Sequence, residues 1–106
     1  MSFFDFFRQP DTNQGVENYQ KDPDAVLLDV RTPQEYRERH IPGSKNVPLQ
    51  TIDKVASVAE NKDTVLFVYC YSGARSRQAV SHLQHMGYTK VNNIGGIAAY
   101  SGKVEM

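Results

Sequence analysis

The arrangement of the whole chain follows from one segment, which reads Thr64-Val65-Leu66-Phe67-Val68-Tyr69-Cys70-Tyr71-Ser72-Gly73-Ala74-Arg75-Ser76. Its first half consists of β-branched, aromatic and other apolar residues and has the length of a strand. Its second half is small and polar and contains a glycine, which is typical of a loop. Apolar residues then recur at helical spacing, at Ala79, Val80, Leu83 and Met86. The segment therefore predicts a strand, a loop and a helix in succession, and the only cysteine ends the strand.

A loop in this position can bind an anion. Its backbone N–H groups curl toward one point, and the free N–H groups of the following helix start point the same way. The atom at that point would be the sulfur of Cys70 or an atom attached to it, and the guanidinium of Arg75 adds a positive charge. Such surroundings lower a cysteine pKa from about 8.5 to between about 3.5 and 7.5. We therefore expect a reactive, anionic nucleophile rather than an inert buried cysteine.

The loop from Cys70 to Ser76 resembles the active loop of the rhodanese-like domains, which begins with a nucleophilic cysteine at a strand end. Three further motifs are similar to signatures of that family and follow in its order: Leu28-Asp29-Val30-Arg31 with Glu35-Tyr36, His40-Ile41-Pro42-Gly43-Ser44 with Asn46-Val47-Pro48, and Gly95-Gly96-Ile97 with Tyr100, where the family more often carries Trp. The resemblance covers roughly residues 12–102. It implies a three-layer α/β fold in which helices cover both faces of a central, mostly parallel sheet.

The resemblance also assigns the site. It implies that Cys70 is the catalytic residue. The loop that would bind the substrate and the persulfide consists of Tyr71, Ser72, Gly73, Ala74, Arg75 and Ser76. From the residue types alone, Gly73 is expected to supply a backbone angle that other residues adopt at a cost. The hydroxyl of Ser76 is expected either to hydrogen-bond the sulfur or to cap the helix.

Length and composition limit the classes of protein to which the chain can belong. A chain of 106 residues is large enough for one domain with a single core. We expect an N-terminal arm over residues 1–11 and a rhodanese-like domain over residues 12–106. Twelve acidic and twelve basic residues balance, which gives no sign of a nucleic-acid footprint. One cysteine excludes an internal disulfide framework, and a nucleophilic thiol suits a reducing compartment, so a cytoplasmic location is expected. No apolar run approaches the roughly 20 residues of a membrane span.

The N-terminal arm contains four phenylalanines between Phe3 and Phe7, interrupted by Asp5. It lacks a basic region before the apolar residues, so it does not resemble a secretory signal. We expect part of it to pack on the domain as an edge strand or arm, as apolar termini usually do. The alternative is a patch for self-association, which keeps both a monomer and a weak dimer open.

The segments around the central one predict an open α/β sheet that is parallel at its centre. Ala25–Val30 is a nearly continuous apolar run, as expected of a strand buried on both faces. A short helix should begin with Thr32 as N-cap, Pro33 at the first position and Glu35 closing a capping box. The other expected elements are an amphipathic helix over residues 49–59, a helix end at Gly87, a short strand over residues 90–94 and a last helical turn over residues 97–100.

Sheets of this kind place their sites outside the carboxyl ends of the strands. Cys70, Arg31 and the pair Gly95-Gly96 are each expected at such an end. Asp29 and Arg31 are accessory candidates: the carboxylate could act as an acid or tie backbone or an arginine, and the guanidinium could attract an anionic substrate or pair with an acid. His40 is a candidate proton donor, but an isolated histidine beside Pro-Gly more commonly satisfies loop backbone.

The spacing of cysteine and arginine separates two chemistries. Loops of tyrosine phosphatases and arsenate reductases place five residues between Cys and Arg, and the phosphatase-like branch of the rhodanese fold carries a longer loop too. Here four residues separate Cys70 from Arg75. A shorter loop forms a tighter cradle, which suits one terminal sulfur better than a phosphoryl group with three outer oxygens. No acid is assigned to protonate a phosphate leaving group. The spacing therefore favours sulfur transfer over phosphoryl transfer.

The resemblance implies a thiosulfate sulfurtransferase. Cys70 would take a sulfane sulfur from a donor such as thiosulfate, hold it as a persulfide and deliver it to cyanide in vitro or to a thiol or protein in cells. Two alternatives stay open: a non-catalytic binding module of the same family, and a redox sensor in which Cys70 is oxidised. Expected partners are small sulfur-containing anions and a thiol or protein acceptor. No cofactor is implied, because three dispersed histidines and one cysteine do not make a metal site.

Overall fold

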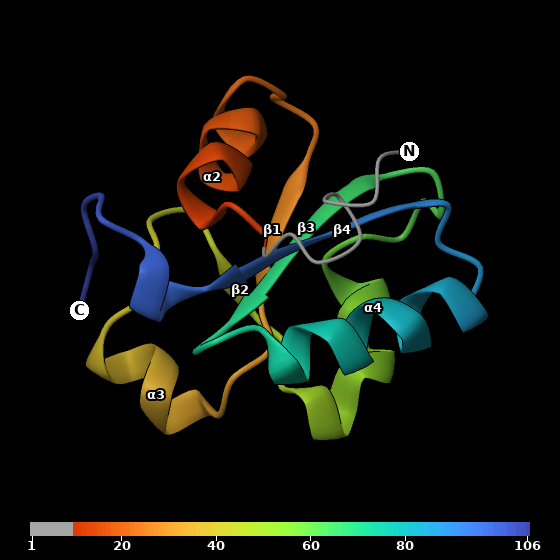
Figure 1. Cartoon of the computed structure of the whole chain (residues 1–106). Helices are drawn as coiled ribbons and strands as arrows, with labels where there is room; N and C mark the ends of the chain where they lie inside the picture. Colours follow the sequence, from red (N-terminus) through yellow and green to blue (C-terminus); the bar gives the residue numbers. More distant parts are fainter. Residues whose placement is uncertain (1–9) are drawn as a thin grey trace, which may run out of the picture.

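The computed structural model describes residues 10–106, and the expectations for Phe3 to Phe7 lie outside the described residues. One sheet runs through the described part of the chain in the order β2-β1-β3-β4, and every pair of neighbours is parallel (Figure 1). Its strands are β1 (Val26–Asp29), β2 (Lys45–Asn46), β3 (Val65–Cys70) and β4 (Lys90–Gly96). The helical elements are α2 (Thr12–Gln20), α3 (Pro33–Glu38), η1 (Leu49–Ser57), α4 (Ala74–His85) and η2 (Ile97–Ala99).

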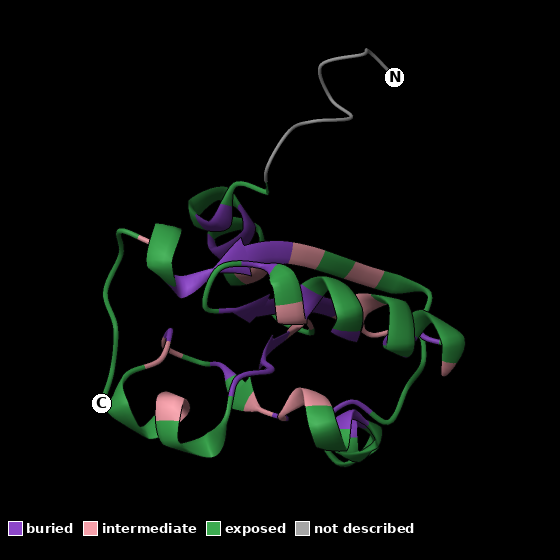
Figure 2. Ribbon diagram, turned by 60° about the horizontal axis from the view of Figure 1, so that its bottom comes forward, coloured by how far each residue is buried: buried purple, intermediate pink, exposed green. Residues whose placement is uncertain are grey.

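Strand β3 lies in the middle of the sheet, and its alternating side chains enter two separate cores. Leu66 and Val68 pack on one face with Leu83 of α4, while Phe67 and Tyr69 pack on the other face with apolar residues that include one from α2. Helix α2 and helix α4 accordingly lie on opposite sides of the sheet (Figure 1). The buried residues form a layer through the middle of the molecule, as Figure 2 shows. The expected α/β fold with helices on both faces is confirmed.

Helix α3 begins as the sequence predicts. Thr32 is its N-cap, Pro33 its first residue, and Glu35 completes a capping box. The Thr32 hydroxyl accepts a hydrogen bond from the Glu35 N–H at 3.2 Å, and a Glu35 carboxylate oxygen accepts one from the Thr32 N–H at 3.1 Å. Because six residues are too few for a stable isolated helix, these caps fix where the helix starts. They also fix the position of the Glu35 side chain.

The segment after β2 differs from the expected amphipathic helix. It is a 3-10 segment broken at Thr51, whose φ and ψ of −126° and 36° are not helical. The Leu49 N–H donates to the carbonyl of Val30 at 3.0 Å, so the start of the segment is tied to the end of β1 and cannot wind freely. Ile52 and Val55 are nevertheless buried, so the apolar face was predicted correctly although the helix type was not.

Strand β4 is longer than expected and includes the glycine pair. Gly95 pairs with Tyr69 and Gly96 pairs with Cys70, after an irregularity in register between Val68 and Tyr69. A Cβ atom built on Gly96 would lie 1.9 Å from the carbonyl oxygen of Tyr71. A residue with a side chain would therefore push the two segments apart, and glycine lets the end of β4 lie directly against the loop that follows β3.

Capping residues define the start of α2 and the end of α4. Asp11, the last residue of the expected arm, caps α2, since its carboxylate accepts a hydrogen bond from the Gln14 N–H at 3.1 Å. Gly87, with φ of +103°, follows the C-cap residue Met86 and ends α4 as predicted. Over residues 10–106, every helix falls short of the length and apolar character that a bilayer crossing requires.

Candidate active site

Cys70 is the last residue of β3, and its side chain is buried. The chain turns immediately after it, because Gly73 adopts a left-handed conformation with φ of +108° and serves as N-cap of α4. This turn brings the Gly73 N–H to 3.0 Å from the Cys70 sulfur. The backbone N–H groups of Ser72 and Ser76 also favour the charged form of the sulfur and lower the pKa of the thiol. The predicted cradle of backbone donors around the cysteine is therefore present.

Two opposing effects act on the pKa of the Cys70 thiol. Burial disfavours the charged form and raises the pKa. Hydrogen bonds from the Ser76 hydroxyl and from the backbone N–H groups of Ser76, Gly73 and Ser72 lower it, and the net result is a pKa below the ordinary value of a cysteine. A larger fraction of the sulfur is then thiolate at neutral pH, which is the nucleophilic form.

Arg75 is the second residue of α4, and its guanidinium is engaged in an ion pair. It forms two hydrogen bonds with the carboxylate of Glu35, at 2.7 and 3.1 Å, and both side chains are about one-third exposed. The Arg75 guanidinium is the main cause that lowers the pKa of Glu35 to about 2, while the Glu35 carboxylate raises the pKa of Arg75. The ion pair joins the active loop to α3 and offsets the positive charge next to the sulfur.

The accessory candidates Asp29 and Arg31 form a buried ion pair with each other. The Arg31 guanidinium donates to the Asp29 carboxylate at 2.7 and 3.0 Å and to the carbonyl oxygen of Arg39 at 2.7 Å. Burial by itself lowers the pKa of Arg31 and is the largest single effect, but the hydrogen bond to Asp29 and the attraction of nearby negative charges together outweigh it, so the pKa is raised. The pair ties the end of β1 to the end of α3. Both groups are thus engaged with each other, and an accessory role in catalysis stays a prediction.

His40 contacts α3 and the C-terminal segment rather than the active loop. Its ring stacks on Tyr36 with centroids 3.8 Å apart, and its Nδ1 lies 2.8 Å from the Tyr36 carbonyl oxygen. The backbone of His40 exchanges two hydrogen bonds of 2.8 Å with Glu105. These contacts satisfy loop backbone, as the sequence suggested.

Asn93 of β4 reaches the site although no motif in the sequence marks it as a site residue. Its Oδ1 lies 2.8 Å from the hydroxyl of Ser76, which in turn lies 3.6 Å from the Cys70 sulfur. The contribution of Glu35 beyond its capping box was also missed. Asn93 lies two residues before the glycine pair, within the short strand that the sequence predicts. Only the register of β4 on β3 brings it next to α4, so no local pattern could have selected it.

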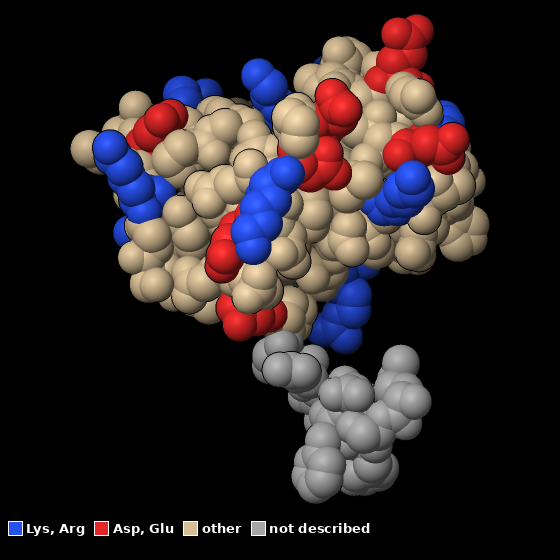
Figure 3. All heavy atoms as spheres, turned by 90° about the horizontal axis from the view of Figure 1, so that it is seen from above, with Lys and Arg blue, Asp and Glu red and all other residues tan. Residues whose placement is uncertain are grey.

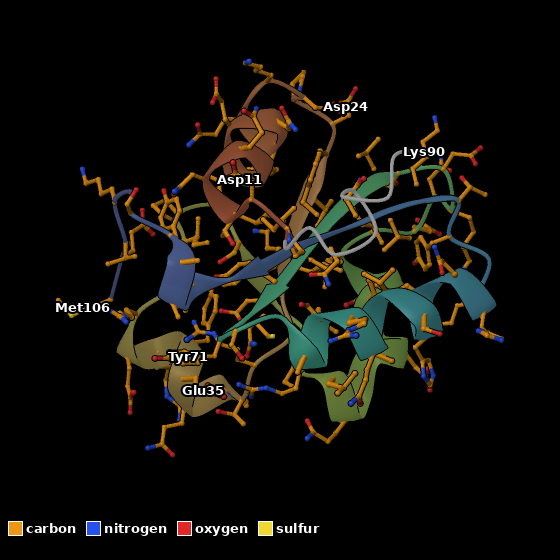
Figure 4. The ribbon with its side chains drawn as sticks, in the orientation of Figure 1. Asp11, Asp24, Glu35, Tyr71, Lys90 and Met106 are labelled. Carbon is orange, nitrogen blue, oxygen red and sulfur yellow. The ribbon has the colours of Figure 1, made fainter. Side chains whose placement is uncertain are left out.

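A cleft of about 290 Å³ adjoins the loop on the side of β4 and η2. Its lining residues are Pro10, Thr12, Tyr71, Ser72, Gly95, Gly96, Ala98 and Ala99. Tyr71 is half-exposed at its rim, at the carboxyl end of β3 (Figure 4). The Tyr71 carbonyl accepts a hydrogen bond from the Ala98 N–H at 3.0 Å, which holds this edge of the loop in place. Ala74, the first residue of α4, is exposed beside Arg75.

Residues 10–106 contain no group of three or more His, Cys, Asp or Glu side chains that could hold a metal ion. On the face shown in Figure 3, acidic and basic side chains of the described residues are interspersed rather than segregated.

Comparison with known proteins agrees with this geometry. The sequence pattern of the rhodanese-like domain matches residues 12–103. The chain belongs to the rhodanese-like domain family. Thiosulfate sulfurtransferase PspE of Escherichia coli K12 is 39% identical over 71 residues, which are 66% of this chain and 68% of that protein. A sulfurtransferase of Allochromatium vinosum is 39% identical over 80 residues, 74% of this chain and 73% of that protein.

A solved structure supports the same assignment for this rhodanese-like domain. A rhodanese with anions from E. coli superposes with a TM-score of 0.72 at 34% identity, covering 76% of this chain and 96% of that one. The match spans only 25% to 45% of some longer relatives. The predicted family is confirmed, and the relatives support sulfur transfer as the general activity of this rhodanese-like domain.

Proposed function

We propose that the protein is a thiosulfate sulfurtransferase that carries sulfur on Cys70. In the first half-reaction the Cys70 thiolate attacks the outer sulfur of thiosulfate. The sulfur–sulfur bond of the donor breaks, its electron pair leaves on sulfite, and a Cys70 persulfide anion remains. Thiolate and thiosulfate dianion thus become persulfide anion and sulfite dianion, so the step needs no oxidant, no cofactor and no proton.

In the second half-reaction an acceptor nucleophile attacks the terminal sulfur of the persulfide, and the Cys70 thiolate leaves with the electron pair of the broken bond. Cyanide would become thiocyanate in vitro. A thiolate, free or on a partner protein, would become a persulfide in cells. A free nucleophilic thiol persists in a reducing compartment, which supports a cytoplasmic location.

The observation that carries this proposal is the set of backbone donors around one buried sulfur. The Gly73 N–H lies 3.0 Å from the Cys70 sulfur, and the N–H groups of Ser72 and Ser76 also lower the pKa of its thiol. Donors that are already oriented stabilise negative charge without reorganising, as they do in an oxyanion hole. They would stabilise both the attacking thiolate and the persulfide anion. The separation of Cys70 and Arg75 by four residues supports a single sulfur, rather than a phosphoryl group, as the transferred unit.

The outer residues of the loop would select the substrate. Arg75 adds a positive charge beside the sulfur that favours an anionic donor, and its ion pair with Glu35 keeps the guanidinium at the rim. Tyr71 and Ser72 border the cleft of about 290 Å³. The part of the acceptor molecule that carries the thiol would lie in this cleft. Small sulfur-containing anions and thiol acceptors, including a thiol of a partner protein, are therefore the proposed partners of a chain that acts as a monomer or weak dimer.

The test is thiocyanate formation from thiosulfate and cyanide. The natural chain should be active, and Arg75→Gln should raise the KM for thiosulfate about tenfold, because the positive charge next to the sulfur is lost. Arg77→Gln is the matched control, since Arg77 is exposed two residues further along α4 and should leave the KM unchanged. Release of phosphate from an aryl phosphate without thiocyanate would favour the phosphatase alternative. Inactivity toward both substrates would favour the binding module or the redox sensor.

A further inference from the structure

The hydroxyl of Ser76 is surrounded by more acceptors than it can serve. It is fully buried and lies 2.8 Å from Asn93 Oδ1, 3.0 Å from the carbonyl oxygen of Gly73 and 3.3 Å from that of Gly95. The Cys70 sulfur lies 3.6 Å away. A serine hydroxyl carries one hydrogen, so it can donate to one of these atoms at a time. Which atom receives that hydrogen decides how the hydroxyl acts on the sulfur.

Asn93 offers the nearest of these acceptors, and its amide orientation is fixed by a second contact. The Gly95 N–H donates to Asn93 Oδ1 at 2.9 Å. If the amide were turned over, its NH₂ group would face the Gly95 N–H, and two donors would oppose each other. The Gly73 carbonyl likewise accepts one backbone N–H, that of Arg77 at 3.1 Å, but it lies slightly farther from the Ser76 hydroxyl, at 3.0 Å. The Ser76 hydrogen therefore has its shortest contact with Asn93.

We propose that the side-chain oxygen of Asn93 competes with the Cys70 sulfur for the Ser76 hydrogen and thereby sets how strongly the hydroxyl can stabilise the thiolate. With the hydrogen on Asn93, the Ser76 oxygen accepts the S–H hydrogen and favours the thiol. With the hydrogen turned to the sulfur, the hydroxyl donates to the thiolate. Asn93 is a positioning residue in this scheme, because it acts on the sulfur through Ser76.

The charged groups around Cys70 occur in pairs of opposite sign, so a hydrogen bond from the Ser76 hydroxyl can change the pKa of the thiol. The charges of Arg75 of α4 and Cys70 interact, but Glu35 of α3 pairs with Arg75 and offsets its charge. At the end of β1, Arg31 and Asp29 form a second ion pair that is closed on itself. These nearby charges occur in oppositely charged pairs. The pKa of the Cys70 thiol therefore depends chiefly on the hydrogen bonds that the sulfur forms.

The consequence for sulfur transfer rests on the proposed function. A thiolate that is too weakly basic attacks the donor slowly, whereas one that is too basic leaves the persulfide slowly. Cys70 must serve as nucleophile in the first half-reaction and as leaving group in the second. The Asn93 oxygen, which acts on the sulfur through the Ser76 hydroxyl, would keep the basicity of the Cys70 thiolate between these extremes.

The test titrates the thiolate by its ultraviolet absorbance, with Cys70→Ser as the blank, and needs no substrate. Asn93→Asp keeps the acceptor for the Gly95 N–H but binds the Ser76 hydrogen more firmly and adds a negative charge. It should lower the ratio of thiolate to thiol at neutral pH about tenfold. Asn92→Asp is the matched control, because Asn92 is exposed on the same strand and contacts the Leu66 carbonyl instead. It should change the ratio less than twofold.

Asn93→Ala provides the opposite change and keeps the proposal falsifiable if the aspartate variant does not fold. Without the nearest competing oxygen, the Ser76 hydrogen turns to the sulfur more often, although the Gly73 and Gly95 carbonyl oxygens still compete for it. The ratio of thiolate to thiol at neutral pH should therefore rise, by about threefold at most. A titration of either folded variant that coincides with the natural chain, or moves in the other direction, would overturn the proposal. A shifted titration in a protein that transfers no sulfur would leave the role of Asn93 intact and refute only the proposed function.

Discussion

At the amino ends of β1 and β3 the molecule carries a cleft of about 380 Å³, whereas the cleft beside the active loop, at the carboxyl ends, measures about 290 Å³. The larger cleft is lined by Asp22, Asp24, Asn61, Asp63, Thr64 and Val65. Its polar groups include local turn contacts, such as those from the Asp24 N–H to Asp22 and from the Asp63 N–H to Asn61. Its lining includes three acidic side chains but no cysteine.

The carboxyl end differs in how its contacts are made. Arg75 meets Glu35 across 40 residues of sequence, and Ser76 meets Asn93 across 17. These contacts converge on one sulfur, and each comes from a different element. The comparison teaches that the size of a hollow does not identify the site. The site is identified by distant polar groups brought together around a reactive atom.

The largest effect expected from this comparison follows from removing the reactive atom. Cys70→Ser should reduce thiocyanate formation at least about a thousandfold, because a serine hydroxyl is not ionised at neutral pH and cannot form a persulfide. The thermal midpoint should change little, since the hydroxyl can use the same backbone donors as the sulfur. Activity within tenfold of the natural chain would place the chemistry elsewhere.

A second change displaces the loop without touching its polar groups. In Gly96→Ala the added Cβ would lie 1.9 Å from the Tyr71 carbonyl oxygen. The loop must shift, so activity should fall about tenfold to a hundredfold and the free energy of unfolding by about 1–3 kcal/mol.

Gly87→Ala is the matched control for this displacement. Its Cβ meets no atom within 4 Å, but its φ of +103° strains a side chain. It should lose about 1 kcal/mol of stability and keep its activity. Equal loss of activity in both variants would show that loss of stability, not displacement of the loop, causes the defect. Activity and denaturant unfolding, measured on the same samples, decide between the two.

The ion pair that joins the loop to α3 should show itself in the pH dependence of stability. The Arg75 guanidinium lowers the pKa of Glu35 to about 2, so the pair stabilises the folded state above the ordinary glutamate pKa near 4.5, and this contribution is lost as the pH falls toward 2. At neutral pH, Glu35→Gln should lower the free energy of unfolding by about 1 kcal/mol or less, since the pair is partly exposed.

The difference between Glu35→Gln and the natural chain should shrink steadily between pH 4.5 and pH 2. Glu38→Gln is the control, because Glu38 is exposed on the same helix and contacts only Gln34 at 3.5 Å. Unfolding curves at several pH values measure this. A difference that is independent of pH would contradict the role of the pair.

The smallest effect is expected at the other end of the sheet. The double substitution Asp22→Asn, Asp24→Asn removes two negative charges from the larger cleft but keeps an oxygen acceptor for the Asp24 N–H. Thiocyanate formation should stay within about twofold of the natural chain, as for surface changes far from a site. A tenfold loss would mean that the cleft at the amino ends of the strands takes part in the reaction. The two clefts would then not differ in function as proposed.

Local patterns predicted most of the elements that build the site. The strand and the helix around Cys70, the capping box of Thr32 and Glu35, and the helix end at Gly87 all depend on residues within one or two turns of each other. The 3-10 form of η1 was not predicted, because the hydrogen bond from Leu49 to Val30 that ties its start joins distant residues.

The polar contacts of the site were predicted less completely for the same reason. The pairing of Glu35 with Arg75 requires α3 and the active loop to meet at one edge of the sheet. The position of Asn93 beside Ser76 depends on the register of β4, including its irregularity between Val68 and Tyr69. Register is a tertiary property, so the sequence predicts Cys70 and its loop as the site but not the contacts of Glu35 and Asn93 with that loop.

The most direct test of the central claim is the intact mass of the protein after incubation with thiosulfate, measured for the natural chain and for Cys70→Ser, before and after addition of cyanide. A gain of one sulfur atom in the natural chain alone, removed again by cyanide, is the predicted result and would establish Cys70 as a persulfide carrier. An unchanged mass in both proteins, or an equal gain in both, would contradict the account.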